Sequence, residues 1–323
     1  MRHSLPTSLF ALALAVFTAA VPSAVAADSP VVAKDSRALP GVALFEGKRT
    51  LWLGDSITQN GLYVSYFEYF LQKQYPQAKF DITSAGLASE TLSGLSESGH
   101  AGGKFGRPCL FERLDRALKA VKPQLVVACY GMNDGIYKPY DEVRMKAFTT
   151  GVEKLAEACR KAGAKLVLVT PPVFEGGDAY EEVLQKFSAW EVAHAPAGVL
   201  FTADLHTAMN TERAARVAKN PKFKFTGDNV HPGELGHLVM ALSVMKELGI
   251  KTPDAPAEEV LASVKTDPLW PVVNGRRSAR SDAWLNFIGY SREKKVAPGT
   301  GDINAAEAKA AARQKQADAL RVK

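Results

Sequence analysis

Residues 51–58 read Leu-Trp-Leu-Gly-Asp-Ser-Ile-Thr, and this stretch decides the fold of the chain. Its first three residues are apolar, as in a short strand that is buried on both faces of a sheet. Gly54 ends the apolar run. Residues 62–75 then carry apolar side chains at helical spacing, at Tyr63, Phe67 and Phe70. A short buried strand followed directly by an amphipathic helix predicts one unit of an α/β sheet.

The same unit recurs outward from this stretch. Strands are predicted at residues 51–53, 80–85, 125–129, 166–169 and 199–203, and helices at residues 62–75, 110–121, 143–161, 180–193 and 234–248. Wholly apolar strands that alternate with amphipathic helices predict an α/β fold, a three-layer αβα sandwich around a parallel sheet of about five strands. In such sheets, binding and catalytic sites form outside the carboxyl ends of the strands.

Three segments are expected along the 323 residues. Residues 1–26 have a basic start, an apolar stretch and small residues up to Ala26, which predicts a signal peptide and export to the periplasm or the cell exterior. Residues 27–250 hold the alternating strands and helices. Residues 251–323 form a C-terminal extension, mostly helical, with a basic helical tail near residues 304–322.

Charge and hydropathy argue against a nucleic-acid-binding protein and against a membrane-anchored one. The formal net charge is +6, and much of the basic charge lies in the C-terminal segment without a nucleic-acid recognition motif. We therefore expect a solvated basic tail and no nucleic-acid partner. No segment after residue 26 is long and apolar enough to span a bilayer, and no Cys follows the small residues, so no membrane anchor is expected.

The three cysteines are Cys109, Cys129 and Cys159, and no Cys-x-x-Cys pair occurs, so neither a zinc site nor a redox motif is indicated. Cys129 ends an apolar run and is expected to be a buried thiol. Cys109 and Cys159 could pair, which the sequence leaves open. No feature calls for a metal or an organic cofactor, and the pattern does not reveal the oligomeric state.

Four short stretches carry residues that could act together in catalysis. Ser56 follows the first strand, Gly86 the second and Asn133 the third, while Asp228 and His231 lie in the loop before the helix at 234–248. Each alone has an ordinary explanation, as a helix cap, a turn residue or a surface histidine. Together, a serine, hydrogen-bond donors and an Asp-x-x-His pair are the parts that acyl transfer needs.

These stretches resemble the SGNH/GDSL hydrolase superfamily. The resemblance rests on Gly-Asp-Ser-Ile-Thr at 54–58, Gly-Met-Asn-Asp at 131–134 and Asp-Asn-Val-His-Pro at 228–232, with a weaker glycine block around Gly86. It covers about residues 49–249, so residues 27–250 are expected to be an SGNH hydrolase domain. The resemblance also implies a flavodoxin-like arrangement of the central sheet.

Residue by residue, the resemblance implies a serine esterase. Ser56 would be the nucleophile, His231 the general base and Asp228 the acid that orients the imidazole. The oxyanion hole would consist of the N–H groups of Ser56 and Gly86 and the side-chain amide of Asn133.

The identity of the ester stays open at this point. Exported members of the superfamily include O-acetylesterases that act on polysaccharides, so O-acetyl groups on carbohydrate are the leading expectation. The polar, Gly-rich loop at residues 94–108 lacks the character of a long acyl-chain tunnel. The alternatives are a lysophospholipase or thioesterase, an acyltransferase, and a non-catalytic glycan-binding module on the same fold. Tyr63, Trp270 and Trp284 could stack on sugar rings or pack the core.

Overall fold

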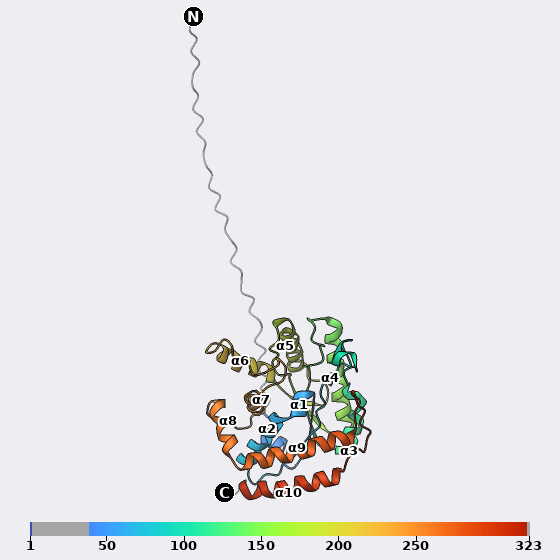
Figure 1. The fold of residues 1–323 in the computed structure, drawn as a ribbon, viewed down its shortest axis with the longest axis vertical. Helices are drawn as coiled ribbons and strands as arrows, with labels where there is room; N and C mark the ends of the chain where they lie inside the picture. The colour runs from blue at the N-terminus through green and yellow to red at the C-terminus, as the bar shows by residue number, and fades with distance from the viewer. Residues whose placement is uncertain (2–38, 322–323) are drawn as a thin grey trace. The chain divides into compact units, whose positions relative to one another are not determined.

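The structure, a computed structural model, describes residue 1 and residues 39–321 of the chain. The predicted signal peptide, residues 1–26, lies outside the described residues except for Met1. The chain from Leu39 onward forms one compact unit, which is drawn in colour in Figure 1.

A parallel sheet of five strands lies at the centre of this unit. The strands are β1 (Arg49–Gly54), β2 (Asp81–Ser84), β3 (Leu125–Cys129), β4 (Lys165–Val169) and β5 (Val199–Ala203). They are ordered β2-β1-β3-β4-β5, the flavodoxin-like order, and every neighbouring pair is parallel. The predicted α/β class and the number of strands are confirmed.

Helices cover both faces of the sheet. The chain crosses from β1 to β2 in one direction and from β2 through β3 and β4 to β5 in the other. Because such crossovers are right-handed, helices made in opposite directions lie on opposite faces. One face therefore carries α2 (Leu62–Gln74), with α7 (Glu234–Glu247) packed beside it, and the other carries α3 (Leu114–Val121), α4 (Glu142–Lys161) and α5 (Asp178–Ala193). The result is the predicted three-layer sandwich.

Besides the five-residue helix α1 (Ser56–Asn60), one helix of the α/β part has no counterpart in the sequence prediction. It is α6 (Leu205–Val217), which follows β5 and begins where the Asp204 carboxylate accepts a hydrogen bond from the N–H of Thr207 at 3.1 Å. Only Leu205, His206 and Met209 of this helix are buried. Because the buried residues are few, α6 lacks the regular apolar stripe by which amphipathic helices are recognised.

The C-terminal extension consists of three helices: α8 (Ala257–Thr266), α9 (Leu269–Ile288) and α10 (Ile303–Arg321). Figure 1 shows α9 and α10 side by side, and α9 packs against α2 and the edge strand β2. Trp270 stacks on Tyr66 of α2 with ring centroids 4.3 Å apart, so this aromatic residue joins the extension to the α/β part.

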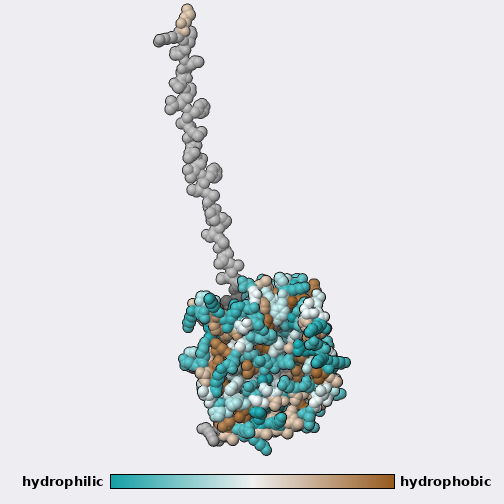
Figure 2. Space-filling model, in the orientation of Figure 1, coloured by the Kyte–Doolittle hydropathy of each residue, from teal (hydrophilic) through white to brown (hydrophobic). Residues whose placement is uncertain are grey.

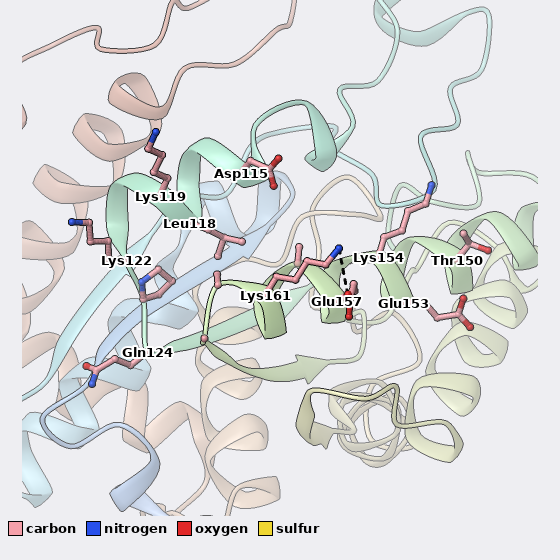
Figure 3. A pocket seen from close by; sticks show the side chains of 14 residues that line it. Asp115, Leu118, Lys119, Lys122, Gln124, Thr150, Glu153, Lys154, Glu157 and Lys161 are labelled. Atoms are coloured by element: carbon pink, nitrogen blue, oxygen red, sulfur yellow. Dashed lines mark ion pairs between the residues drawn. The ribbon is translucent and has the colours of Figure 1, made fainter.

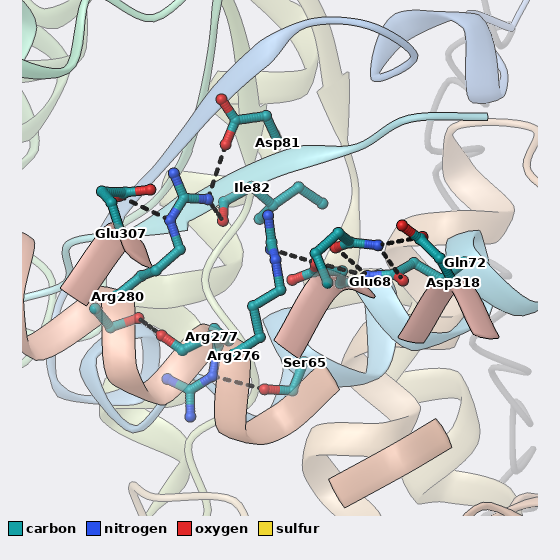
Figure 4. A network of polar contacts seen from close by, with 12 residues as sticks. Ser65, Glu68, Gln72, Asp81, Ile82, Arg276, Arg277, Arg280, Glu307 and Asp318 are labelled. Atoms are coloured by element: carbon teal, nitrogen blue, oxygen red, sulfur yellow. Dashed lines mark hydrogen bonds and ion pairs between the residues drawn. The ribbon is translucent and has the colours of Figure 1, made fainter. Parts of the chain in front are cut away.

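The expectation that the basic charge of this extension is solvated is wrong for α9. Arg276, Arg277 and Arg280 are buried, with 4–6% of each residue exposed. Figure 4 shows them turned toward α2 and β2: Arg276 pairs with Glu68 at 2.6 Å and Arg280 with Asp81 at 2.8 Å. The partners lie about 200 residues away in the chain, so the sequence pattern could not reveal them. Lysines of α10 such as Lys309 are exposed, as expected.

All three cysteines are free thiols. Cys129 and Cys159 are buried and Cys109 is half-buried, so the suggested pairing of Cys109 with Cys159 does not occur in this structure. Burial raises the pKa of the Cys159 thiol to about 12, which leaves it an unreactive core group.

The surface of the described part is mixed in character. On the face drawn in Figure 2, hydrophobic residues are scattered among hydrophilic ones. Within residues 39–321, every helix is too short or too polar to cross a membrane.

Candidate active site

Ser56 is the first residue of the short helix α1 (Ser56–Asn60), directly after β1. The Asp55 side chain caps this helix by accepting a hydrogen bond from the N–H of Ile57 at 2.9 Å. Gly54 is required at the turn, because a Cβ there would lie 2.1 Å from the Thr58 hydroxyl oxygen. The turn therefore presents the serine hydroxyl at the carboxyl edge of the sheet, beside the N-terminus of a helix.

His231 meets Ser56 at this edge, although 175 residues separate them. The Ser56 Oγ lies 2.8 Å from the His231 Nε2, and the His231 Nδ1 lies 2.6 Å from Oδ2 of Asp228. The other oxygen of Asp228 accepts hydrogen bonds from the backbone N–H of His231 at 2.7 Å and of Val230 at 3.0 Å. The three side chains thus form one unbroken hydrogen-bonded chain.

Asp228 is held in its ionised form. Its partial burial favours the neutral acid, but hydrogen bonds from the His231 N–H, the imidazole and the Val230 N–H outweigh that effect and lower the pKa of Asp228 to about 2. An ionised acceptor at the His231 Nδ1 keeps a proton on that nitrogen, which leaves Nε2 free to accept the proton of Ser56.

Gly86 lies against the start of α1. A Cβ at Gly86 would come within 2.4 Å of the Gln59 nitrogen and 2.5 Å of the Thr58 carbonyl carbon, so only glycine fits. Within residues 39–321, no group accepts a hydrogen bond from the N–H of Gly86 or of Ser56. Both donors are available to a bound oxygen atom.

Asn133 follows β3, the strand beside β1. Register pairs Gly54 with Cys129, so Ser56 and Asn133 leave the sheet at the same edge. The Asn133 side chain is 4% exposed and its Nδ2 donates to the backbone oxygen of Glu90 at 3.3 Å, which leaves its second N–H bond free. The two strands lie where the strand order reverses, which is where ligands bind in open α/β sheets.

Two buried carboxylic acids, Asp55 and Asp134, are sequence neighbours of Ser56 and Asn133. Burial raises the pKa of Asp55 to about 7, and the nearby carboxylate of Asp134 adds to the shift. Burial also raises the pKa of Asp134 to about 6, against hydrogen bonds from backbone N–H groups that favour its ionised form. Those bonds come from residues 92, 93 and 131, so Asp134 ties the loop after β2 to the loop after β3.

Glu175 supports the loop that carries Asp228 and His231. Its side chain is fully buried, and its carboxylate accepts hydrogen bonds from the N–H of Phe225 at 3.2 Å and from the N–H and hydroxyl of Thr226 at 2.9 and 2.6 Å. Arg213 pairs with it at 3.1 Å, and its own N–H donates to the Asn229 oxygen. Sequence reasoning missed Glu175, because nothing local in the chain relates it to a loop 50 residues away.

The aromatic residues that the sequence offered for sugar stacking pack against other parts of the chain. Tyr63 is fully buried and stacks on His237, with centroids 6.1 Å apart, and Trp284 donates to the Glu307 carboxylate. The packing alternative therefore holds for Tyr63, Trp270 and Trp284. Burial lowers the pKa of His237 to about 3, so this histidine is neutral and unsuited to exchange protons near neutral pH.

A groove in the described part lies away from these residues. It encloses about 1120 Å³ between α3 and α4, where Figure 3 shows Lys119, Lys122, Lys154 and Lys161 around its rim. Pro123 and Gly163, which precede β3 and β4, line its floor, so it sits at the opposite edge of the sheet from Ser56. Among the described residues, no three His, Cys, Asp or Glu side chains are grouped so as to hold a metal ion.

Comparisons with known proteins identify the family of the chain. The sequence profile of the GDSL-like lipase/acylhydrolase family matches residues 52–239, more than half of the chain. An acetylxylan esterase from Geobacillus stearothermophilus is 22% identical over 233 residues, which cover 64% of this chain and 95% of that protein.

Solved structures are similar as well. A catalytic mutant of the acetylxylan esterase Axe2 from Geobacillus stearothermophilus has a TM-score of 0.49 at 22% identity, covering 64% of this chain and 96% of that one. A gut microbial diltiazem-metabolizing enzyme, BT4096, has a TM-score of 0.50 at 19% identity, covering 64% of this chain and 47% of that one. Because its identity is only 19%, the similarity to BT4096 shows a shared fold and nothing further.

Proposed function

Because the chain belongs to the GDSL-like lipase/acylhydrolase family and is therefore an ester hydrolase, we propose that it cleaves carboxylic esters with a Ser56–His231–Asp228 triad. The observation that carries this proposal is the hydrogen-bonded chain from the Ser56 hydroxyl through both nitrogens of His231 to the Asp228 carboxylate, with contacts of 2.8 and 2.6 Å. A serine hydroxyl becomes an effective nucleophile when an adjacent base removes its proton.

The proposed reaction has two halves. Ser56 Oγ attacks the ester carbonyl while its proton passes to His231 Nε2, and the oxyanion that forms accepts hydrogen bonds from the N–H groups of Ser56 and Gly86 and from the amide of Asn133. As the tetrahedral intermediate collapses, His231 gives the proton to the leaving alcohol and an acyl-enzyme remains. A water molecule then repeats the sequence, and the acid is released.

We propose O-acetyl groups on carbohydrate as the substrate. The acetylxylan esterase relative supports this class. The exposure of the site supports it too, since 48% of the His231 side chain and 57% of the Asp228 side chain face water. A polysaccharide is bulky and hydrated, so its acetyl groups can be reached only by a nucleophile near the surface.

We propose that the enzyme acts outside the cytoplasm, since residues 1–26 have the pattern of a cleaved signal peptide. Sequencing the N-terminus of the protein purified from periplasm and medium tests this. A mature chain that begins near residue 27 is expected, and an intact N-terminus in the cytoplasmic fraction would refute export.

Ser56→Ala tests the chemistry. With p-nitrophenyl acetate and with acetylated xylooligosaccharides, the variant should lose on the order of 10⁶-fold in kcat, because the nucleophile is absent. Ser263→Ala, at an exposed position on α8, is the matched control and should keep full activity.

The same assays separate the alternatives. A preference for long-chain over acetyl p-nitrophenyl esters would indicate a lysophospholipase or thioesterase. An acylated product formed from an added acceptor sugar would indicate a transferase. Equal hydrolysis by wild type and Ser56→Ala would remove the proposed nucleophile, and no hydrolysis by either would favour a glycan-binding module.

A further inference from the structure

Asn133 can serve an oxyanion hole only if its amide faces the right way. The amide carries an acceptor oxygen on one side and donor N–H bonds on the other, and only the donors stabilise negative charge. A flip of the amide would present an oxygen atom to the developing oxyanion. A neighbouring group must therefore bind the amide oxygen of Asn133 selectively, so that the amide nitrogen faces the oxyanion.

The structure supplies two donors that hold the oxygen end. Arg107 Nη1 donates to Asn133 Oδ1 at 2.8 Å, and the Tyr137 hydroxyl donates to the same oxygen at 3.1 Å. A guanidinium has no acceptor, so a flipped amide would set N–H bonds against N–H bonds and lose this contact. On its other side Nδ2 is bonded to the backbone oxygen of Glu90.

Arg107 is itself held firmly. Its Nε and Nη2 donate to the two carboxylate oxygens of Glu97 at 2.8 and 2.7 Å, a two-pronged ion pair, and its side chain is 6% exposed. Its guanidinium carbon lies 5.2 Å from the centroid of the Tyr137 ring. With the guanidinium fixed on three sides, Nη1 is aimed at Asn133 without further loss of side-chain entropy.

Tyr137 reaches this position through an unusual backbone. Ile136 and Tyr137 have φ values of 50° and 55°, in the left-handed region that costs energy for residues other than glycine. The Tyr137 ring stacks on Tyr180, with centroids 4.8 Å apart, and this packing keeps the strained turn in place. The turn directs the phenol hydroxyl toward Asn133, four residues back.

From these contacts, and resting on the proposed function, we propose that Arg107 and Tyr137 are positioning residues that orient and polarise the Asn133 amide for the oxyanion. The guanidinium charge on Oδ1 draws electron density away from Nδ2, so its free N–H bond becomes a stronger donor. The benefit appears only when the carbonyl oxygen becomes charged. It therefore acts on kcat and leaves KM almost unchanged.

A double-mutant cycle in kcat on p-nitrophenyl acetate tests this proposal. Asn133→Ala should lose on the order of 10²–10³-fold, the usual cost of one oxyanion donor. Arg107→Met should lose about 10- to 100-fold, with KM changed less than about threefold. In the Asn133→Ala background, Arg107→Met should lose less than about threefold more, because the group through which Arg107 acts is already gone. If the kcat loss of the double variant equals the product of the losses of the two single variants, the proposal is refuted.

Tyr137→Phe is the second variant, and it removes a single hydroxyl. It should lower kcat about 3- to 10-fold in the wild-type background and have no further effect in Asn133→Ala. Arg160→Met, at an exposed Arg of α4 that pairs with Glu157, is the control and should leave kcat unchanged. If Arg107→Met fails to fold, the double-mutant cycle of Tyr137→Phe with Asn133→Ala replaces it. Losses in kcat that multiply in that cycle would likewise refute the proposal.

Failure of this proposal is distinguishable from failure of the proposed function. If Ser56→Ala abolishes hydrolysis while Arg107→Met and Asn133→Ala act independently, the nucleophile stands and the positioning role is refuted. If Asn133→Ala has full activity, Asn133 is no oxyanion donor, and the positioning role falls with it.

Discussion

At the scale of single residues, the site depends on protonation states that burial sets. Asp228 faces water and collects hydrogen bonds, so it stays ionised. Asp55, one residue before the proposed nucleophile, is 3% exposed and has a pKa raised to about 7 by burial. The two carboxylic acids thus titrate in different pH ranges, because only one of them is solvated and well supplied with donors.

This difference predicts how stability changes with pH. The pKa of Asp55 rises from 3.8 to about 7 on folding, so the folded state binds the extra proton. Its stabilising effect is complete below pH 3.8 and is lost as the pH rises through 7. Between pH 4.5 and 8 the wild type should lose roughly 3 kcal/mol of unfolding free energy relative to Asp55→Asn, at 1.36 kcal/mol per pKa unit.

Urea unfolding of both proteins across that pH range is the measurement. Asp254→Asn, at an exposed position, serves as the control and should show the pH dependence of the wild type. Parallel curves for wild type and Asp55→Asn would contradict a raised pKa at Asp55.

At the scale of elements, strands position one part of the candidate site and a loop positions the other. The parallel strands β1 and β3 deliver Ser56 and Asn133 to one edge, and backbone pairing alone decides that placement. The loop with Asp228 and His231 belongs to no strand. It reaches the same edge because the carboxylate of Glu175, after β4, gathers the backbone N–H groups of residues 225 and 226.

Glu175→Ala should therefore disturb the base more than substrate binding. Loss of the carboxylate leaves two buried N–H groups and the Thr226 hydroxyl without an acceptor, at a cost on the order of 2–4 kcal/mol in unfolding free energy. We expect kcat to fall at least about tenfold with a smaller change in KM. Glu182→Ala, at a carboxylate of α5 that is 60% exposed, is the matched control. An unchanged kcat in Glu175→Ala would show that the loop with Asp228 and His231 keeps its conformation without the Glu175 carboxylate.

At the scale of the whole molecule, residues 251–321 are bound into the α/β part. Helix α9 pairs Arg276 with the buried Glu68 and the buried Arg280 with the partly exposed Asp81, as Figure 4 shows, so buried charges of the extension have their partners in the α/β part. Such pairs are costly to break, because the remaining charge is left in a site without water.

A chain of residues 27–250 tests that dependence. Without α9, Glu68 and the aromatic face of α2 lose their partners, so we expect loss of near-ultraviolet circular dichroism and a tendency to aggregate. The chain 27–323 is the control and should unfold cooperatively. Full activity of the shorter chain would mean that residues 251–323 are a separate appendage.

The sequence by itself determined the class of fold and the candidate site. Strands and helices of the α/β part follow from local apolar periodicity, which is a property of neighbouring residues. Ser56, Gly86 and Asn133 stand out because short motifs after strands carry recognisable chemistry, and Asp228 and His231 because they form an Asp-x-x-His pair in a loop. The residues that support them, such as Arg107 and Glu175, have no local signature.

Tertiary structure alone decided the rest. It determined that Arg107 holds Asn133, that Glu175 holds the loop of His231, and that the arginines of α9 are buried instead of solvated. It also determined which carboxylic acids lose contact with water. The physical reason is the same in each case: hydrogen bonds and desolvation depend on which distant segments meet, and that information is absent from the pattern of any one segment.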